Sequence, residues 1–73
     1  MARLPNLAYV QSFTAVALAG SLAAATKAGA SSQATLSRHI AALEAELNVT
    51  LFERRGDGLA LTQTGTNLLE HAK

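Results

Sequence analysis

The start of one predicted helix carries side chains that could hydrogen-bond to base edges or to phosphate oxygens. The residues there are small or polar: Ser32, Gln33, Ala34, Thr35, Ser37 and Arg38. A glutamine amide can pair with adenine, and an arginine guanidinium can pair with guanine or with a phosphate. A serine hydroxyl and the free N–H groups of a helix N-terminus can hold a phosphate oxygen. Each residue alone is equally ordinary on a solvated helix, so the interpretation depends on the elements around the segment.

Apolar residues on the opposite side of this segment show how it would be held. They recur in steps of four, three and four: Leu36, Ile40, Leu43 and Leu47. This spacing places them on one face of a helix over residues 32–47 and leaves the polar start outside. Ser31 or Ser32 can cap the start of that helix, and Asn48 tolerates the left-handed conformation in which many helices end.

Two helices are predicted before residue 31. Asn6 can cap the first, which carries apolar residues at helical spacing until Gly20 ends it. Ser21 can cap a short second helix from Leu22 to about Ala28. The next two residues, Gly29 and Ala30, would make a tight connection to the helix over residues 32–47.

The periodicity changes after Asn48. The runs VTLFERR and LALT are short and β-prone, and the sequence GDG between them is a strong turn signal. Two such short strands cannot stand alone, so they must pack as a hairpin on the helices. Thr62 or Thr64 can then cap a last helix that carries Leu68, Leu69 and Ala72.

Three helices, a two-stranded hairpin and one more helix predict a mainly α fold, the winged helix-turn-helix. In that arrangement the helix over residues 32–47 enters the major groove of double-stranded DNA. The hairpin over residues 51–62, the wing, would lie on the flanking backbone through Arg54 and Arg55. An ion pair between Arg54 and Glu44 is an equally good alternative, whereas Arg55 points to the other side of the strand.

Composition limits the other possibilities. The net charge of +1 does not by itself indicate a nucleic-acid partner, and a winged-helix module for protein–protein interaction with little DNA affinity remains the alternative. The chain has no cysteine, no Ser/His/Asp set and no paired carboxylates, so we expect no enzyme, no metal and no cofactor. His39 is expected to be a packing residue. The segment over residues 15–30 resembles the apolar part of a signal peptide but is too polar and too short to span a membrane.

The pattern as a whole resembles the N-terminal DNA-binding domain of LysR-type transcriptional regulators, without gaps from Phe13 to Gly65. The matching residues are Phe13, Val16, Ala17, Gly20, Ser21, Ala25, Ser32, Gln33, Leu36, Ser37, Ile40, Leu43, Glu44, Leu47, Leu51, Phe52, Arg54, Leu61, Thr62 and Gly65. The resemblance implies that the helix-turn-helix falls on residues 22–41 and that Gln33, Ala34, Ser37 and Arg38 face the bases.

The resemblance also implies partners. Residues 1–62 would form the DNA-binding domain of a bacterial, cytoplasmic regulator, and residues 63–73 would begin a linker helix. That helix would join a homodimer through Leu68, Leu69 and Ala72, and the dimer would bind an inverted-repeat operator. An effector ligand would bind only a further domain that this chain lacks.

Some positions depart from the family pattern. Alanine stands at position 34 where proline is frequent, and Asn48 replaces a glycine. The wing tip has Asp57 and Gly58 where arginine is frequent, which leaves Arg54 and Arg55 as the cations of the wing. Gly29 replaces a larger apolar residue and is expected to loosen the second helix by about 1 kcal/mol relative to alanine.

Overall fold

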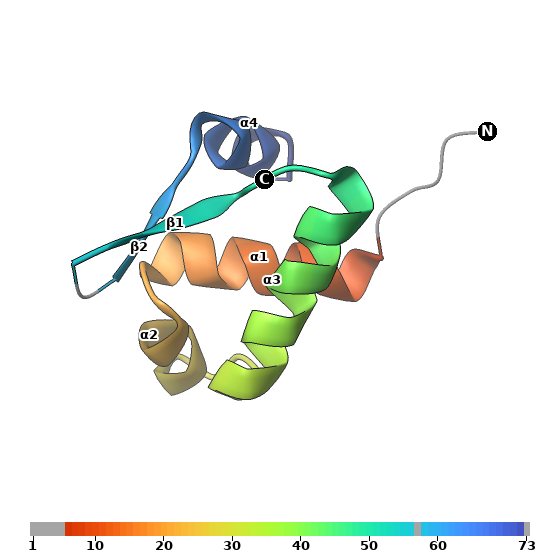
Figure 1. Ribbon diagram of the computed structural model, residues 1–73. Coiled ribbons are helices and arrows are strands. Elements are labelled where there is room, and N and C mark those ends of the chain that lie inside the picture. The colour runs from red at the N-terminus through yellow and green to blue at the C-terminus, as the bar shows by residue number, and fades with distance from the viewer. Residues whose placement is uncertain (1–5, 57, 73) are drawn as a thin grey trace.

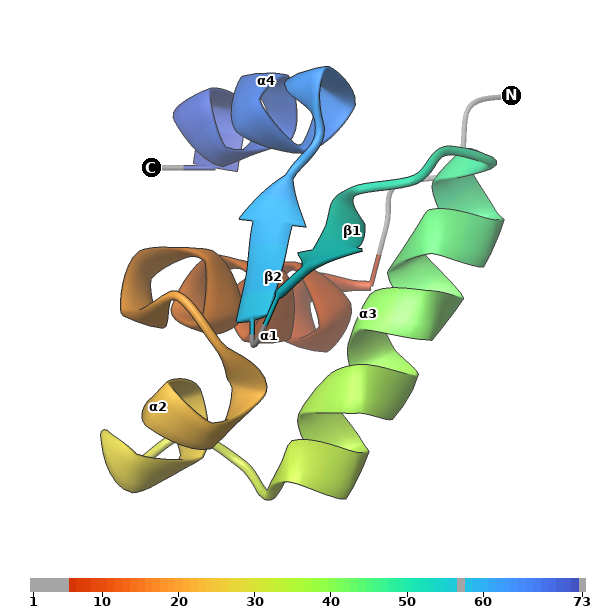
Figure 2. The same ribbon diagram turned by 60° about the vertical axis from the view of Figure 1, so that its left-hand side comes forward.

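The computed structural model describes residues 6–56 and 58–72 of the chain. The elements follow in the predicted order: α1 (Leu7–Ala19), α2 (Leu22–Lys27), α3 (Gln33–Leu47), β1 (Phe52–Arg55), β2 (Gly58–Leu61) and α4 (Gln63–Ala72). In Figure 1, α1 runs behind α3, and the hairpin and α4 lie on one side of this pair. Helix α2 and the first turns of α3 lie at the opposite end of the molecule from α4, as Figure 2 also shows. The mainly α winged helix-turn-helix is therefore confirmed.

The first two helices begin and end where their capping residues stand. The Asn6 side chain accepts a hydrogen bond from the Ala8 N–H at 2.8 Å, and Gly20 ends α1 with φ 93°. The Ser21 hydroxyl accepts from the Ala24 N–H at 3.0 Å. Helix α2 ends at Lys27, one residue before the predicted end.

The prediction that Gly29 loosens α2 is wrong. Gly29 lies beyond the end of the helix and has φ 103°. A glycine adopts this left-handed conformation without the steric cost that a side chain would impose. Gly29 therefore allows the sharp turn between α2 and α3.

Helix α3 has the predicted caps. The Ser32 hydroxyl, rather than that of Ser31, accepts from the Thr35 N–H at 3.2 Å. Asn48 follows the helix with φ 56°, and its N–H donates to the Glu44 carbonyl. The buried core residues come from α1, α2, α3 and the segment before β1: Phe13, Val16, Ala25, Leu36, Ile40, Leu43 and Leu51. Leu47, expected in this core, is only half-buried against it.

The hairpin is antiparallel and pairs Phe52 with Leu61 and Arg55 with Gly58. Its first strand is shorter than the run over residues 49–55. Thr62, not Thr64, caps α4: its hydroxyl accepts from the Gly65 N–H at 3.0 Å and donates to the Thr50 carbonyl at 2.6 Å.

Helix α4 packs on the body through residues that were predicted to form a dimer. Leu68 and Leu69 are half-buried and pack against the core. Part of their apolar surface is therefore already covered within one chain. The side chain of Ala72 lies outside the described residues.

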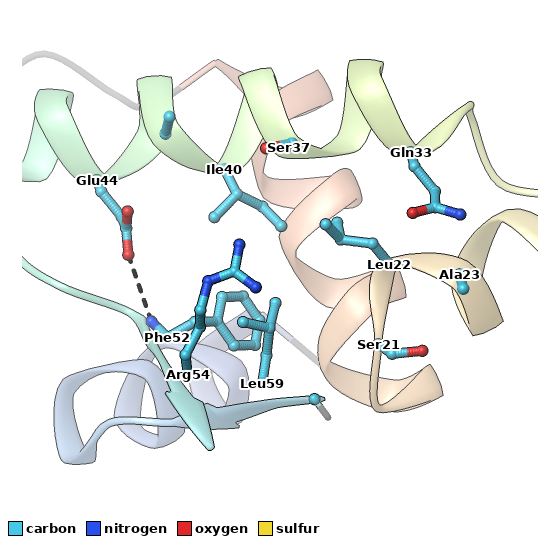
Figure 3. A pocket seen from close by; sticks show the side chains of 12 residues that line it. Ser21, Leu22, Ala23, Gln33, Ser37, Ile40, Glu44, Phe52, Arg54 and Leu59 are labelled. Carbon is cyan, nitrogen blue, oxygen red and sulfur yellow. Dashed lines mark hydrogen bonds between the residues drawn. The ribbon is translucent and has the colours of Figure 1, made fainter. Parts of the chain in front are cut away.

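Glu44 ties α3 to the wing. Its carboxylate accepts from the backbone N–H groups of Leu51 at 2.7 Å and Phe52 at 3.3 Å. Its position at the edge of β1 is visible in Figure 3. The alternative in which Glu44 pairs with Arg54 is wrong, because no such ion pair forms within residues 6–56 and 58–71. The backbone amides take this carboxylate because they lie directly beside it where the chain enters the strand.

Gly65 lets α4 approach the wing. A Cβ at position 65 would collide with the Leu51 carbonyl oxygen and would lie 2.9 Å from Cδ2 of Leu61. The Leu51 oxygen belongs to the backbone and cannot move aside as a flexible side chain can. Position 65 therefore needs a residue without a side chain.

Replacing Glu44 with alanine should lower the free energy of unfolding by about 1–3 kcal/mol, because two part-buried N–H groups lose their acceptor. Urea unfolding followed by circular dichroism measures the loss. The control is Glu46→Ala, which removes an exposed carboxylate from the same helix and should change stability by less than about 0.5 kcal/mol. Equal losses for the two variants would contradict this role of Glu44.

Replacing Gly65 with alanine should destabilise the fold by about 1–3 kcal/mol, although alanine normally favours a helix over glycine. The control is Gly58→Ala, whose Cβ would meet only the Gly20 carbonyl oxygen, at an ordinary 3.8 Å. Thermal unfolding of both variants compares the effects. A Gly65→Ala variant as stable as the parent chain would show that α4 does not lie against Leu51.

Candidate nucleic-acid interface

The first half of α3 presents its polar side chains to solvent. Gln33, Ala34, Ser37 and Arg38 are exposed, as is the capping Ser32. The buried stripe on the other side of the helix leaves this surface uncovered. Figures 1 and 2 show that this end of α3 lies away from the hairpin and α4. The predicted contact surface is therefore open.

Thr35 differs from its neighbours because it takes part in hydrogen bonds within the helix. Its hydroxyl accepts from the Ser32 hydroxyl at 3.1 Å and from Nη2 of Arg38 at 3.5 Å. The half-buried Thr35 side chain thus links the cap of α3 to the guanidinium one turn later. This contact draws the Arg38 side chain back toward the start of the helix.

The two arginines of the wing have different surroundings. The Arg55 guanidinium forms an ion pair with Glu53, two residues earlier on the same face of the strand, at 3.5 Å. Arg54 is exposed and has no acidic partner within residues 6–56 and 58–71. Its side chain extends from β1 toward α3 (Figure 3). Arg54 is therefore the wing arginine that forms no ion pair with the described residues.

An open cleft of about 430 Å³ separates α3 from the wing and α2, and we call it the helix–wing cleft. Its large apolar residues come from all three parts: Leu22, Ile40, Phe52 and Leu59. Ser21, Gln33, Ser37 and Arg54 line it as well, so two hydroxyls, one amide and one guanidinium face a common space (Figure 3). The Glu44 carboxylate also lines the cleft, but it already accepts from the N–H groups of Leu51 and Phe52. The four donor residues are therefore the ones free to bind a ligand. Such a set can donate hydrogen bonds to phosphate oxygens or to base edges.

The remaining predicted site residues lie outside this cleft. Ser32, Ala34, Thr35, Arg38 and Arg55 do not line it. The first four belong to the start and the outer side of α3, and Arg55 lies near the tip of the hairpin. The predicted residues therefore form a surface that extends from the start of α3 across the cleft to the wing.

Sequence reasoning missed the contribution of α2 to the cleft. Ser21, Leu22 and Ala23 line it, yet Ser21 was assigned only as a helix cap and Leu22 only as the first residue of the second helix. The sequence signal that could have identified these residues was their place at the start of the second helix of a helix-turn-helix.

The structure offers little to other kinds of site. Within residues 6–56 and 58–72, no group of three or more His, Cys, Asp or Glu side chains could hold a metal ion. In the same part of the chain, no helix has both the length and the apolar character needed to cross a membrane.

Comparison with known proteins identifies the family. The family described as "Bacterial regulatory helix-turn-helix protein, lysR family" matches residues 7–66. The HTH-type transcriptional regulator GalR of Pseudomonas putida KT2440 is 44% identical over 70 residues, which cover 96% of this chain and 18% of that protein. The regulator TcbR of Pseudomonas sp. strain P51 is 48% identical over 61 residues, 84% of this chain and 21% of that protein.

Solved structures agree with the sequence comparison. The LysR family transcriptional regulator CbnR superposes with a TM-score of 0.86 at 43% identity, over 92% of this chain and 23% of that chain. A crystal structure of a CbnR_DBD–DNA complex superposes with a TM-score of 0.84 at 43% identity, over 92% of this chain and 77% of that one. The chain spans about one fifth of the length of the full regulators it resembles. With both sequence and fold matched over nearly all of its length, the chain belongs to the LysR family of bacterial regulatory helix-turn-helix proteins.

Proposed function

We propose that this chain is the DNA-binding domain of a transcriptional regulator and binds double-stranded DNA in a sequence-specific manner. In this proposal α3 enters the major groove, and the wing lies on the flanking backbone. The observation that carries it is the open polar surface at the start of α3, on a fold that matches the DNA-bound domain of CbnR. A helix fits the major groove when the inserted end is slim, as it is at Ala34 and Ser37.

The side chains suggest a division of roles. Gln33 pairs with an adenine edge and Arg38 with a guanine edge, since these are the geometrically favoured pairings. Ser32 and the N–H groups at the start of α3 hold a phosphate oxygen with the help of the helix dipole. Arg54 contacts a phosphate across the helix–wing cleft. The short side chains of Ala34 and Thr35 let α3 lie close to the DNA. Arg55 contributes less than Arg54, because Glu53 offsets its charge.

Further proposals follow from family membership. Residues 1–62 act as the DNA-binding domain, and residues 63–73 begin a linker helix through which two copies pair. The homodimer binds an inverted-repeat operator, because the symmetry of a protein dimer is mirrored in the spacing of its half-sites. The site of action is the bacterial cytoplasm, where the DNA is. Any effector binds a part of the regulator outside this chain.

Selection of bound duplexes from a random pool tests the function. The expected winners share a half-site, and an inverted repeat among them supports the dimer. The net charge of +1 makes the outcome informative, because bulk charge alone gives little nonspecific affinity. Absence of enrichment, together with no binding to random duplex at low salt, would favour the protein–protein interaction module instead.

Replacing Arg38 with alanine should cost about 1–3 kcal/mol of binding free energy on the selected duplex and relax preference at one base pair. The matched variant Arg38→Lys keeps the charge but loses the planar fork, so it should retain affinity for random duplex and still lose the base preference. Titrations against duplexes changed one base pair at a time measure both effects. Unchanged preference at every position would remove Arg38 from the base-contacting surface.

Replacing Arg54 with alanine should weaken binding to all duplexes about equally and reduce the slope of log K against log salt by about one. The matched variant Arg55→Ala should have the smaller effect, because its guanidinium is paired with Glu53. Titrations of random duplex over a range of salt concentrations provide the comparison. A loss at one base position only, or a larger effect for Arg55, would contradict the assignment of Arg54 to a phosphate.

A further inference from the structure

One hydrogen bond joins α3 to α1 through side chains alone. Ser12 Oγ and His39 Nδ1 lie 2.7 Å apart, with either the hydroxyl or the ring N–H as donor. Within residues 6–56 and 58–71, this is the one side chain–side chain hydrogen bond between two different elements. Ser12 is 7% exposed, and the Tyr9 ring packs on the imidazole with 5.1 Å between ring centroids. The contact is therefore specific and shielded.

His39 and Glu44 hold opposite flanks of α3. On a helix with 3.6 residues per turn, positions 39 and 44 point about 140° apart. The whole apolar stripe lies in the arc between them: the buried Leu36, Ile40 and Leu43 and the half-buried Leu47. His39 bonds to α1 on one flank, and Glu44 bonds to the start of the wing on the other. The two bonds together oppose rotation of α3 about its own axis.

Such rotation matters more for base contacts than for stability. The free energy of apolar burial depends mainly on the area buried and little on direction, whereas a hydrogen bond is directional. Side-chain ends lie about 5–6 Å from the helix axis, so a rotation of 10–20° moves them by about 1–2 Å. That displacement exceeds the range of donor–acceptor distances in a good hydrogen bond. A rotated α3 would still meet phosphates but would lose its alignment with base edges.

We propose that the Ser12–His39 hydrogen bond sets the rotation of α3 and thereby the sequence selectivity of DNA binding. Both residues are positioning residues, because Ser12 is buried on α1 and His39 is half-buried beside it. They act on the bases through Arg38, the neighbour of His39 in the chain, which points about 100° farther round the helix. The inference rests on the proposed function.

The test compares Ser12→Ala with the parent chain on two probes at one salt concentration. One probe is the duplex selected from the random pool, and the other is random duplex. We expect the ratio of the two affinities to fall about 5- to 50-fold, within the effect of losing one bidentate base contact. Affinity for random duplex should stay within about twofold. A loss of folded protein lowers both affinities equally and leaves the ratio unchanged, so the ratio separates positioning from stability.

Two further single variants and one double variant sharpen the result. Thr14→Val removes another hydroxyl of α1, one that donates to the Val10 carbonyl of the same helix at 2.9 Å, and should keep the parent ratio. His39→Phe keeps a ring against Tyr9 but removes the hydrogen bond to Ser12, so it should reproduce the loss. In an Arg38→Ala background, Ser12→Ala should lower the ratio by less than it does in the parent chain, because the Arg38 contact is already absent and only the Gln33 contact can still be lost.

The possible failures are distinguishable. If the parent chain does not discriminate between the two probes, the proposed function itself fails, and this inference fails with it. If the parent chain discriminates and Ser12→Ala retains its ratio, only the positioning role of Ser12 and His39 is overturned. A full additional loss from Ser12→Ala in the Arg38→Ala background would overturn the route through Arg38.

Discussion

The structure depends on contacts that fix α3 in the fold from one side of the helix only. A helix that enters a DNA groove must leave more than half of its surface uncovered, so every contact that fixes it has to come from the remaining arc. Here that arc contains the buried stripe of Leu36, Ile40 and Leu43, with hydrogen bonds from His39 and Glu44 at its edges. The stripe supplies most of the binding energy between α3 and the body. The flanking hydrogen bonds are directional and oppose rotation of α3 about its own axis.

The wing and α4 also help to fix α3 from this one side. Glu44 binds the backbone at the entry to β1, and Thr62 bonds to Thr50 across the base of the hairpin. Gly65 then allows α4 to lie against Leu51, which is fully buried. This sequence of contacts places Arg54 across the helix–wing cleft from Gln33 and Ser37. A weak net charge is thus compatible with a DNA-binding surface, because three exposed arginines, Arg38, Arg54 and Arg55, belong to α3 and the wing, the elements that would face DNA.

Local signals predicted the elements well, and contacts between distant residues were the harder part. The caps at Asn6, Ser21 and Asn48 act within a few residues of their own position, so composition and spacing sufficed to place the helix ends. Glu44 was recognised as close to the wing, but a sequence cannot say whether a carboxylate there takes a guanidinium or backbone amides. The partner of His39, 27 residues away on α1, left no pattern in the sequence at all. The open side of α3 was predictable because it is the complement of its apolar stripe.

The central claim is that the uncovered side of α3, together with Arg54, is the surface that meets DNA. The most direct measurement is a map of backbone amide NMR shifts as the selected duplex is added to the chain. The account predicts the largest changes over residues 32–38 and at Arg54, with little change on the outer side of α1, where Leu7 and Leu18 are 68% and 67% exposed. Changes centred on Leu7 and Leu18, with the start of α3 unaffected, would contradict it.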